Sequence, residues 1–140
     1  HVSPRRSAQG VDSGRLAMLL AVLERRAGVN LAQHEVFASV VGGVKLSEPG
    51  ADLGLCLALV SAVTNQPLAE NLVACGEVGL AGELRQASNT ARRLGEAARL
   101  GFTRAIIPAS SAKDIKISGI KLEPAETVAQ ALALAGLSVK

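Results

Sequence analysis

The chain has 140 residues, of which 49% are hydrophobic and 19% are charged, a composition that excludes an intrinsically disordered protein and indicates one globular domain. With two Phe and no Trp or Tyr, it lacks the aromatic side chains on which RNA-recognition and OB-type domains stack bases. A formal net charge of +3 is compatible with a polyanionic partner and does not demonstrate one.

The N-terminal segment, residues 1–12, is polar and turn-rich, and we expect it to precede a single domain over 13–140. The sequence begins with His1 and Val2 and not with an initiator Met, so we interpret these two residues as a cloning remnant or a fragment boundary. Cys56 and Cys75 each lie in an apolar stretch without zinc-ligand spacing, which predicts buried free thiols. No apolar run reaches membrane-spanning length without polar interruption, so we expect a reduced, cytoplasmic protein with no membrane partner.

Helical spacing, β-branched runs and turn residues define the elements that we expect. Asp12 or Ser13 can cap the first helix, and Ser88-Asn89 a later one. Strands alternate with helices, which indicates an α/β domain. In chain order we predict a helix over 13–28, a strand over 34–44, a buried helix over 53–63, a strand over 72–80 bent at its glycines, a helix over 90–101, a buried strand over 104–107, an edge strand over 115–120 and a final helix over 123–134.

A Pro-Gly turn leads into the buried helix at Asp52. Many hydrolases hold a nucleophile at such a junction, because a helix N-terminus stabilises negative charge. An Asp there is more simply an N-cap. Ser61 lies deep in the helix, and His34 has no Ser or Cys partner identifiable from the sequence. The glycines of CGEVGLAGEL match neither a Walker A loop nor a GxGxxG fingerprint, so we expect no nucleotide site.

Four long segments carry a family resemblance. They are SPRRSAQGVDSGRLAMLLAVLERRAG, HEVFASVVGGVKLSEPGADLGLCLALVSAVTNQPL, CGEVGLAGELRQ and RRLGEAARLGFTRAIIP. Together they resemble the C-terminal domain of the RadA (Sms) family of bacterial DNA repair and recombination proteins, over about residues 3 to 135. One departure is Gln86-Ala87, where the family usually has Pro-Val. That domain in turn resembles the proteolytic domain of Lon. The resemblance implies the α/β fold shared by Lon proteolytic domains and the second domain of ribosomal protein S5, a mixed sheet packed with helices.

The resemblance also implies where the two catalytic side chains of Lon would fall. Its Gly-Pro-Ser-Ala-Gly loop corresponds to residues 50–54, which puts the serine position at Asp52. Its Thr-Gly-Glu-Ile-Thr-Leu-Arg-Gly strand resembles residues 75–82, and counting on without gaps puts the lysine position at Ala91. Arg92 cannot replace that lysine, because a guanidinium stays protonated and cannot act as general base. We therefore expect a Lon-type scaffold that is no enzyme by itself.

The resemblance implies that a full-length RadA-type protein contains a zinc finger, a RecA-like ATPase and this domain in one chain. It also implies that such a protein acts as a ring-shaped, ATP-driven branch-migration helicase with ATP, Mg and Zn as cofactors. Neither zinc-finger nor Walker motifs occur here, so we expect no cofactor in this chain. The role that the resemblance implies is a scaffold for a homo-hexameric ring that also contacts phosphates of single-stranded or branched DNA. The basic residues expected to do so are Arg5, Arg6, Arg15, Lys45, Arg85, Arg92 and Arg93.

Two alternatives remain beside this interpretation. A pure oligomerisation domain that touches no DNA fits the modest charge of +3. A residual Lon-like peptidase is disfavoured, because both the nucleophile and the base are missing from the positions that the resemblance gives.

Overall fold

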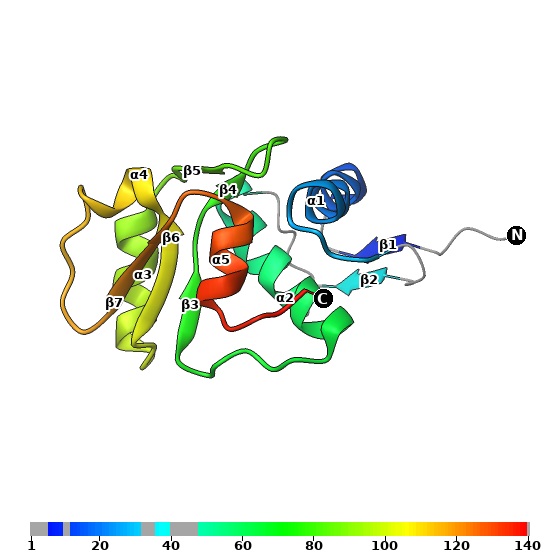
Figure 1. Ribbon diagram of the computed structural model, residues 1–140. Helices are drawn as coiled ribbons and strands as arrows, with labels where there is room; N and C mark the ends of the chain where they lie inside the picture. The colour runs from blue at the N-terminus through cyan, green and yellow to red at the C-terminus, as the bar shows by residue number, and fades with distance from the viewer. Residues whose placement is uncertain (1–5, 10–11, 32–35, 40–47, 140) are drawn as a thin grey trace, which may run out of the picture.

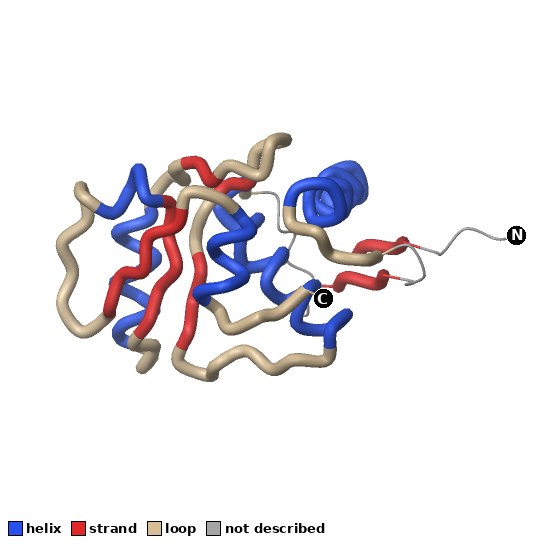
Figure 2. Tube along the Cα trace, viewed as in Figure 1, coloured by secondary structure: helices blue, strands red, loops and turns tan. Residues whose placement is uncertain are grey.

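Helices and strands alternate along the chain, as Figure 1 and Figure 2 show for the computed structural model, which describes residues 6–9, 12–31, 36–39 and 48–139. The expected α/β class is confirmed. In chain order the elements are β1 (Arg6–Gln9), α1 (Ser13–Arg26), β2 (Val36–Ser39), the 3₁₀ helix η1 (Pro49–Ala51), α2 (Asp52–Thr64), β3 (Leu72–Ala74), β4 (Glu77–Val78), β5 (Leu84–Arg85), α3 (Thr90–Arg99), β6 (Arg104–Pro108), α4 (Ala109–Ala112), β7 (Lys121–Ala125) and α5 (Val128–Leu134).

The central sheet has the strand order β3-β6-β7, and its strands are all parallel. Arg104 at the start of β6 pairs with Leu72 on one side and with Lys121 on the other. Two smaller pairs accompany it: β1 runs parallel to β2, and β4 runs antiparallel to β5. The resulting arrangement mixes parallel and antiparallel pairs, as the Lon resemblance implies.

Strand β6 separates two hydrophobic clusters, because successive side chains of a strand point to opposite faces. Ile106 joins a cluster with the leucines of α1 and α2 and with Leu132 of α5. Ala105 and Ile107 join a second cluster around Leu94 of α3. In Figure 1, α2 and α5 accordingly lie on one side of the sheet and α3 on the other. Small aliphatic side chains make up most of both clusters, and Phe102 packs against the second one.

The helices of the first half follow the sequence closely. The Asp12 carboxylate accepts a hydrogen bond from the Arg15 backbone N–H at 2.8 Å and caps α1, as expected. Helix α2 ends at Asn65, whose left-handed backbone (φ 55°) stops it just before Pro67. The predicted strand over 34–44 is confirmed for β2, and its remaining residues lie outside the described part of the chain.

The predicted strand over 72–80 is divided into β3 and β4 at Gly76. The Gly76 N–H donates to the Gly50 carbonyl at 3.0 Å, and its own carbonyl accepts from the Leu53 N–H at 3.0 Å. A side chain at Gly76 would also meet the Pro108 ring, at 3.0 Å from Cγ. The expected close approach at this glycine is therefore confirmed, and it ties the central sheet to the start of α2.

Three local predictions were wrong. Residues 6–9 of the segment expected to be turn-rich form β1, because they pair with β2. Residues 115–120 form no strand: their isoleucines pack into the second cluster from an irregular loop, and Gly119 has a left-handed backbone (φ 83°). The strand follows as β7, so α5 begins at Val128 and not at 123, with Thr127 accepting from the Gln130 N–H at 3.1 Å.

The predicted cap position of α3 is confirmed at Asn89, but the expected capping hydrogen bond does not form. Asn89 adopts a left-handed backbone and its side chain makes no capping hydrogen bond, while the Thr90 hydroxyl donates to the Ala87 carbonyl at 2.8 Å. Among the helices that the structure describes, none combines the length and apolar character needed to cross a bilayer.

Candidate functional site: the junction of η1 and α2

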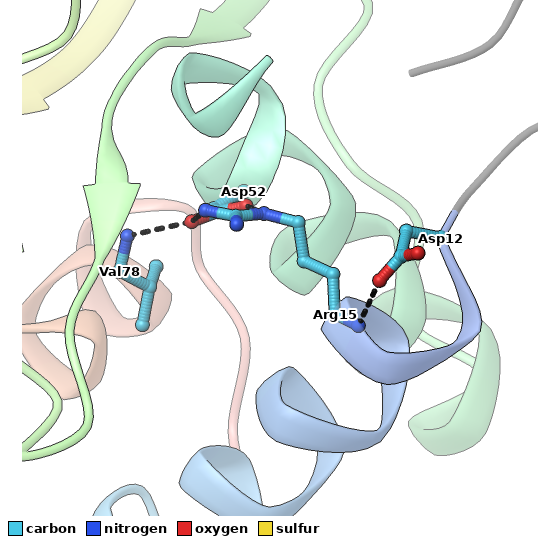
Figure 3. A network of polar contacts seen from close by, with 4 residues as sticks. All are labelled: Asp12, Arg15, Asp52 and Val78. Atoms are coloured by element: carbon cyan, nitrogen blue, oxygen red, sulfur yellow. Dashed lines mark hydrogen bonds and ion pairs between the residues drawn. The ribbon is translucent and has the colours of Figure 1, made fainter. Parts of the chain in front are cut away.

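Asp52, at the position implied for the Lon serine, is a buried carboxylate held by three hydrogen bonds (Figure 3). Arg15 donates to it twice, from Nε to Oδ1 at 2.5 Å and from Nη2 to Oδ2 at 2.5 Å. The Val78 backbone N–H donates to Oδ2 at 3.0 Å. One carboxylate thus connects α2 to both α1 and β4.

Asp52 is not the N-cap of its helix, contrary to our expectation. Ala51 occupies that position, and the Asp52 side chain makes no capping hydrogen bond. The Asp52 and Leu53 N–H groups instead donate to the carbonyls of Pro49 and Gly76. Since backbone carbonyls satisfy these donors, the carboxylate is free to bind the guanidinium of α1.

The surroundings of Arg15 favour its charged form. The Arg15 side chain is 23% exposed and that of Asp52 only 2%. Hydrogen bonding to Asp52 raises the pKa of Arg15, and the nearby charges of Glu77 and Asp12 act in the same direction. The guanidinium is therefore permanently cationic, and it compensates a carboxylate that would otherwise be buried without a countercharge.

A cavity of about 250 Å³ lies between the loop before α2 and the loop before α3. Arg93 of α3 forms an ion pair with Glu48 across it, and Glu77 also lines it. Gly50 also lines the cavity, and a Cβ added to it would lie 3.0 Å from the Ala87 Cβ and 3.5 Å from Arg93 Nη1. The full lining is Glu48, Pro49, Gly50, Glu77, Gln86, Ala87, Ser88, Asn89 and Arg93.

Neither position implied for catalysis lines this cavity. Asp52 is turned away from it toward Arg15, and Ala91 is exposed on the first turn of α3. An acyl-transfer site needs a nucleophile and a base that converge on one substrate atom. The two positions hold instead the Asp52 carboxylate, which is engaged in an ion pair, and the Ala91 methyl group.

Seven basic residues are predicted to contact DNA, and the structure describes the side chains of four of them. Three of them are paired with carboxylates: Arg15 with Asp52, Arg85 with Glu83, and Arg93 with Glu48. The Arg85 hydrogen bond to Glu83 lowers the pKa of that carboxyl. The pairs leave these arginines with less free charge to offer a phosphate.

Of the other four basic residues predicted to contact DNA, the structure describes the side chain of one, Arg92. Arg92 is exposed on α3, and among the described residues it has no ion pair. Arg6 belongs to β1. Arg5 and Lys45 lie outside the described residues.

The described part of the chain holds no group of three His, Cys, Asp or Glu side chains arranged for a metal ion. Both cysteines are buried free thiols, as predicted. Burial raises the pKa of Cys56 to about 12, with the Asp52 charge adding to the effect, and burial raises the pKa of Cys75 as well. Neither thiol is suited to nucleophilic chemistry at neutral pH.

Residues 29–135 match the family of the Lon protease (S16) C-terminal proteolytic domain. The chain belongs to this family. The Lon-type domain is also similar to the DNA repair protein RadA of Haemophilus influenzae and of Escherichia coli K12, at 46% identity over 132 residues in each case, which cover 94% of this chain and 29% of the relative. RadA of Mycobacterium tuberculosis H37Rv is 50% identical over 108 residues, 77% of this chain and 22% of the relative.

Both resemblances inferred from the sequence are thereby confirmed. The Lon-type domain spans less than a third of the length of these RadA relatives. Sequence reasoning placed Asp52 at the centre of the site but missed its partner, because nothing in the sequence links it to a residue 37 positions away. It also missed the ion pair between Glu48 and Arg93, because these residues meet only when the loop before α2 packs near α3.

Proposed function

We propose that this chain is a non-catalytic Lon-type domain of a RadA-type DNA repair protein, where it provides a scaffold for a homo-hexameric ring and contacts DNA phosphates. The observation that carries the non-catalytic role is the Asp52 carboxylate, which is buried and holds Arg15 through two hydrogen bonds of 2.5 Å. A side chain that joins two helices in this way has a structural function at the position implied for a nucleophile.

The chemistry supports the same proposal. A carboxylate that accepts three hydrogen bonds is a weak nucleophile, because attack would require breaking them. Ala91 offers no amine to act as base. Arg93 is already paired with Glu48.

A peptidase assay tests the non-catalytic role. The purified chain is incubated with fluorescent casein, beside a Lon protease as positive control and an Asp52→Asn variant whose folding is checked by circular dichroism. We expect no cleavage above buffer by either form of the chain. Cleavage by the wild type that disappears in a folded Asp52→Asn variant would reverse the proposal.

The DNA contact is supported by the net charge of +3 and by the similarity to proteins named for DNA repair. Fluorescence anisotropy of a labelled single-stranded oligonucleotide, titrated with the chain at low and near-physiological salt, tests it. We expect binding that weakens steeply with salt, since phosphate contacts release counterions. Replacing Arg5, Arg6, Lys45 and Arg92 one at a time then tests which of the predicted cations contribute to DNA binding.

The second candidate function is a pure oligomerisation domain. The ion pairs of Arg15, Arg85 and Arg93 favour it, because they engage three of the predicted DNA contacts within the domain. Assembly without DNA binding at low salt is the result expected for this alternative.

The remaining activities belong to the longer protein in this proposal. ATP, Mg and Zn would act in the zinc finger and the RecA-like ATPase, and the branch-migration helicase would be the ring as a whole, in the bacterial cytoplasm. This domain would supply no cofactor site of its own.

A further inference from the structure

We infer that Lys113, Lys116 and Lys121 form one phosphate-binding surface, here called the lysine edge, through which the domain contacts a DNA backbone. The inference rests on the proposed DNA contact and assigns it to residues other than the predicted arginines. All three lysines are exposed: Lys113 is the C-cap that follows α4, Lys116 lies in the loop after it, and Lys121 begins β7.

The three lysines of the lysine edge carry free charge, as do the exposed residues Arg25, Arg26 and Arg92. Among the described residues, five arginines form ion pairs with carboxylates, whereas Lys113, Lys116 and Lys121 form none. The acidic residues nearby in sequence are Asp114, which is exposed, and Glu123, which is bound to Arg104 and feels the charge of Lys121. Residues 113–121 therefore carry three cations and one anion.

The loop that carries these lysines is anchored, so that its backbone is held against the sheet. Ile115 and Ile117 are partly buried against the second hydrophobic cluster, and Ile120 is buried within it. Lys116 lies between the two inward-facing isoleucines and is exposed. The Asp114 and Ile115 N–H groups donate to the Ser111 and Ala112 carbonyls, at 3.1 and 3.4 Å. Cations on an anchored backbone lose less conformational entropy on binding than cations on a mobile one.

A lysine can also serve to protect an exposed sheet edge from pairing with another chain, but this role does not explain all three residues of the lysine edge. Strand β7 is an edge of the central sheet, and both Lys121 and Pro124 are suited to block pairing with another chain. Lys113 and Lys116 lie outside β7, where no edge needs protection. Figure 1 shows the α4–β7 segment at the end of the molecule opposite β1 and β2, so that the surface is separate from α1 and its arginines.

The chemistry of the array fits a phosphodiester backbone. Lysine ammonium groups bind phosphates as point charges and need no fixed planar geometry, unlike the paired forks of arginine. A surface of this kind is expected to bind without base preference, because it contains no group that reads base edges.

The test compares two matched double variants of the 140-residue chain. Lys113→Gln/Lys116→Gln removes two charges of the lysine edge, and adding Lys121→Gln removes the third. Arg25→Gln/Arg26→Gln removes two exposed charges from the last turn of α1, which have no ion pair in the described residues. The two doubles therefore have the same net charge. Circular dichroism verifies that each variant is folded.

The readout is the salt dependence of binding to a labelled single-stranded oligonucleotide. The slope of log K against log salt is expected to flatten by about 0.7 for each lysine removed and to stay unchanged in the arginine control. Equal loss in both doubles, or a wild-type slope and affinity in the lysine variants, would overturn the lysine edge while the proposed DNA contact stands. Absence of binding by the wild type at low salt would overturn both.

Discussion

Arg15 of α1 and Asp52 of α2 are joined by two parallel hydrogen bonds, Nε to Oδ1 and Nη2 to Oδ2, each 2.5 Å long. The pair is asymmetric, because Asp52 is 2% exposed and Arg15 is 23% exposed. An Arg15 side chain that lost its partner could still reach water. An Asp52 carboxylate that lost its partner would remain buried with the Val78 N–H alone.

The asymmetry predicts unequal costs of mutation. Arg15→Met should lower the free energy of unfolding by about 3 kcal/mol, since it leaves a buried carboxylate without countercharge. Asp52→Asn should cost about 1–2 kcal/mol, because the amide can still accept from Val78. Urea unfolding measures both. The matched control is Arg99→Gln, which breaks the exposed pair with Glu96 and should cost less than about 0.5 kcal/mol. Equal costs for all three variants would refute a structural role of the pair.

Gly82 combines a left-handed backbone with a close neighbour. Its φ is +82°, and a Cβ would lie 2.9 Å from the Arg26 Cβ on α1. Gly101 has a similar φ of +97° with no neighbouring atom within 4 Å. Gly101→Ala should therefore cost about 1–2 kcal/mol from backbone strain, and Gly82→Ala a further 1–3 kcal/mol, roughly, from the clash. Thermal unfolding of the two variants separates these contributions, and a Gly82→Ala variant no less stable than Gly101→Ala would contradict the contact.

The two thiols should be unreactive in the folded chain. With the pKa of Cys56 raised to about 12, only about one molecule in ten thousand carries the thiolate at pH 8. Burial raises the pKa of Cys75 too and limits access to both sulfur atoms. Ellman's reagent at pH 8 should modify neither within minutes in buffer and both in guanidinium chloride. Rapid labelling of one thiol in buffer would show that its part of the core opens easily.

The Arg104–Glu123 pair should make stability fall in acid. Hydrogen bonding to Arg104 holds the pKa of Glu123 below its usual value, with the Lys121 charge contributing. A carboxyl with a lowered folded-state pKa stabilises the fold above its unfolded pKa of about 4.3, and this contribution is lost as the pH falls through the folded value.

Urea midpoints between pH 7 and pH 3 measure this effect. Glu123→Gln should flatten the acid limb of the curve, whereas Glu70→Gln, at an exposed position with no ion pair in the described residues, should leave it unchanged. Arg104 is not the residue to replace, because it also donates to the Leu134 carbonyl at the end of α5. Parallel curves for the wild type and Glu123→Gln would rule out this origin of acid sensitivity.

Local patterns predicted the first half of the fold better than the last third. Helix α1 was predictable because its leucines recur at helical spacing behind a capping Asp12. Ile115 and Ile117 alternate with polar residues as in a strand, yet they and Ile120 anchor a loop, and the true strand β7 contains Pro124. Tertiary packing against α3 decides that choice, and a sequence pattern does not record it.

The site shows the same division. The loop entering α2 is distinctive enough to place Asp52 at the implied nucleophile position. Its contact with Arg15 depends on how α1 crosses α2, which is a property of the packed cluster of leucines. The arginines were weighted equally from the sequence, because ion pairing with Glu48 or Glu83 is visible only in three dimensions.

The placement of β6 between two clusters has a consequence during synthesis on the ribosome. Helices α1 and α2 emerge first, but the wall on which they pack includes Ile106 and, later still, Leu132. Part of the apolar surface of these two helices therefore remains uncovered until nearly the whole chain has been translated. Such a nascent intermediate exposes hydrophobic surface to its neighbours. The first half of this protein should thus depend most on chaperones that hold growing chains.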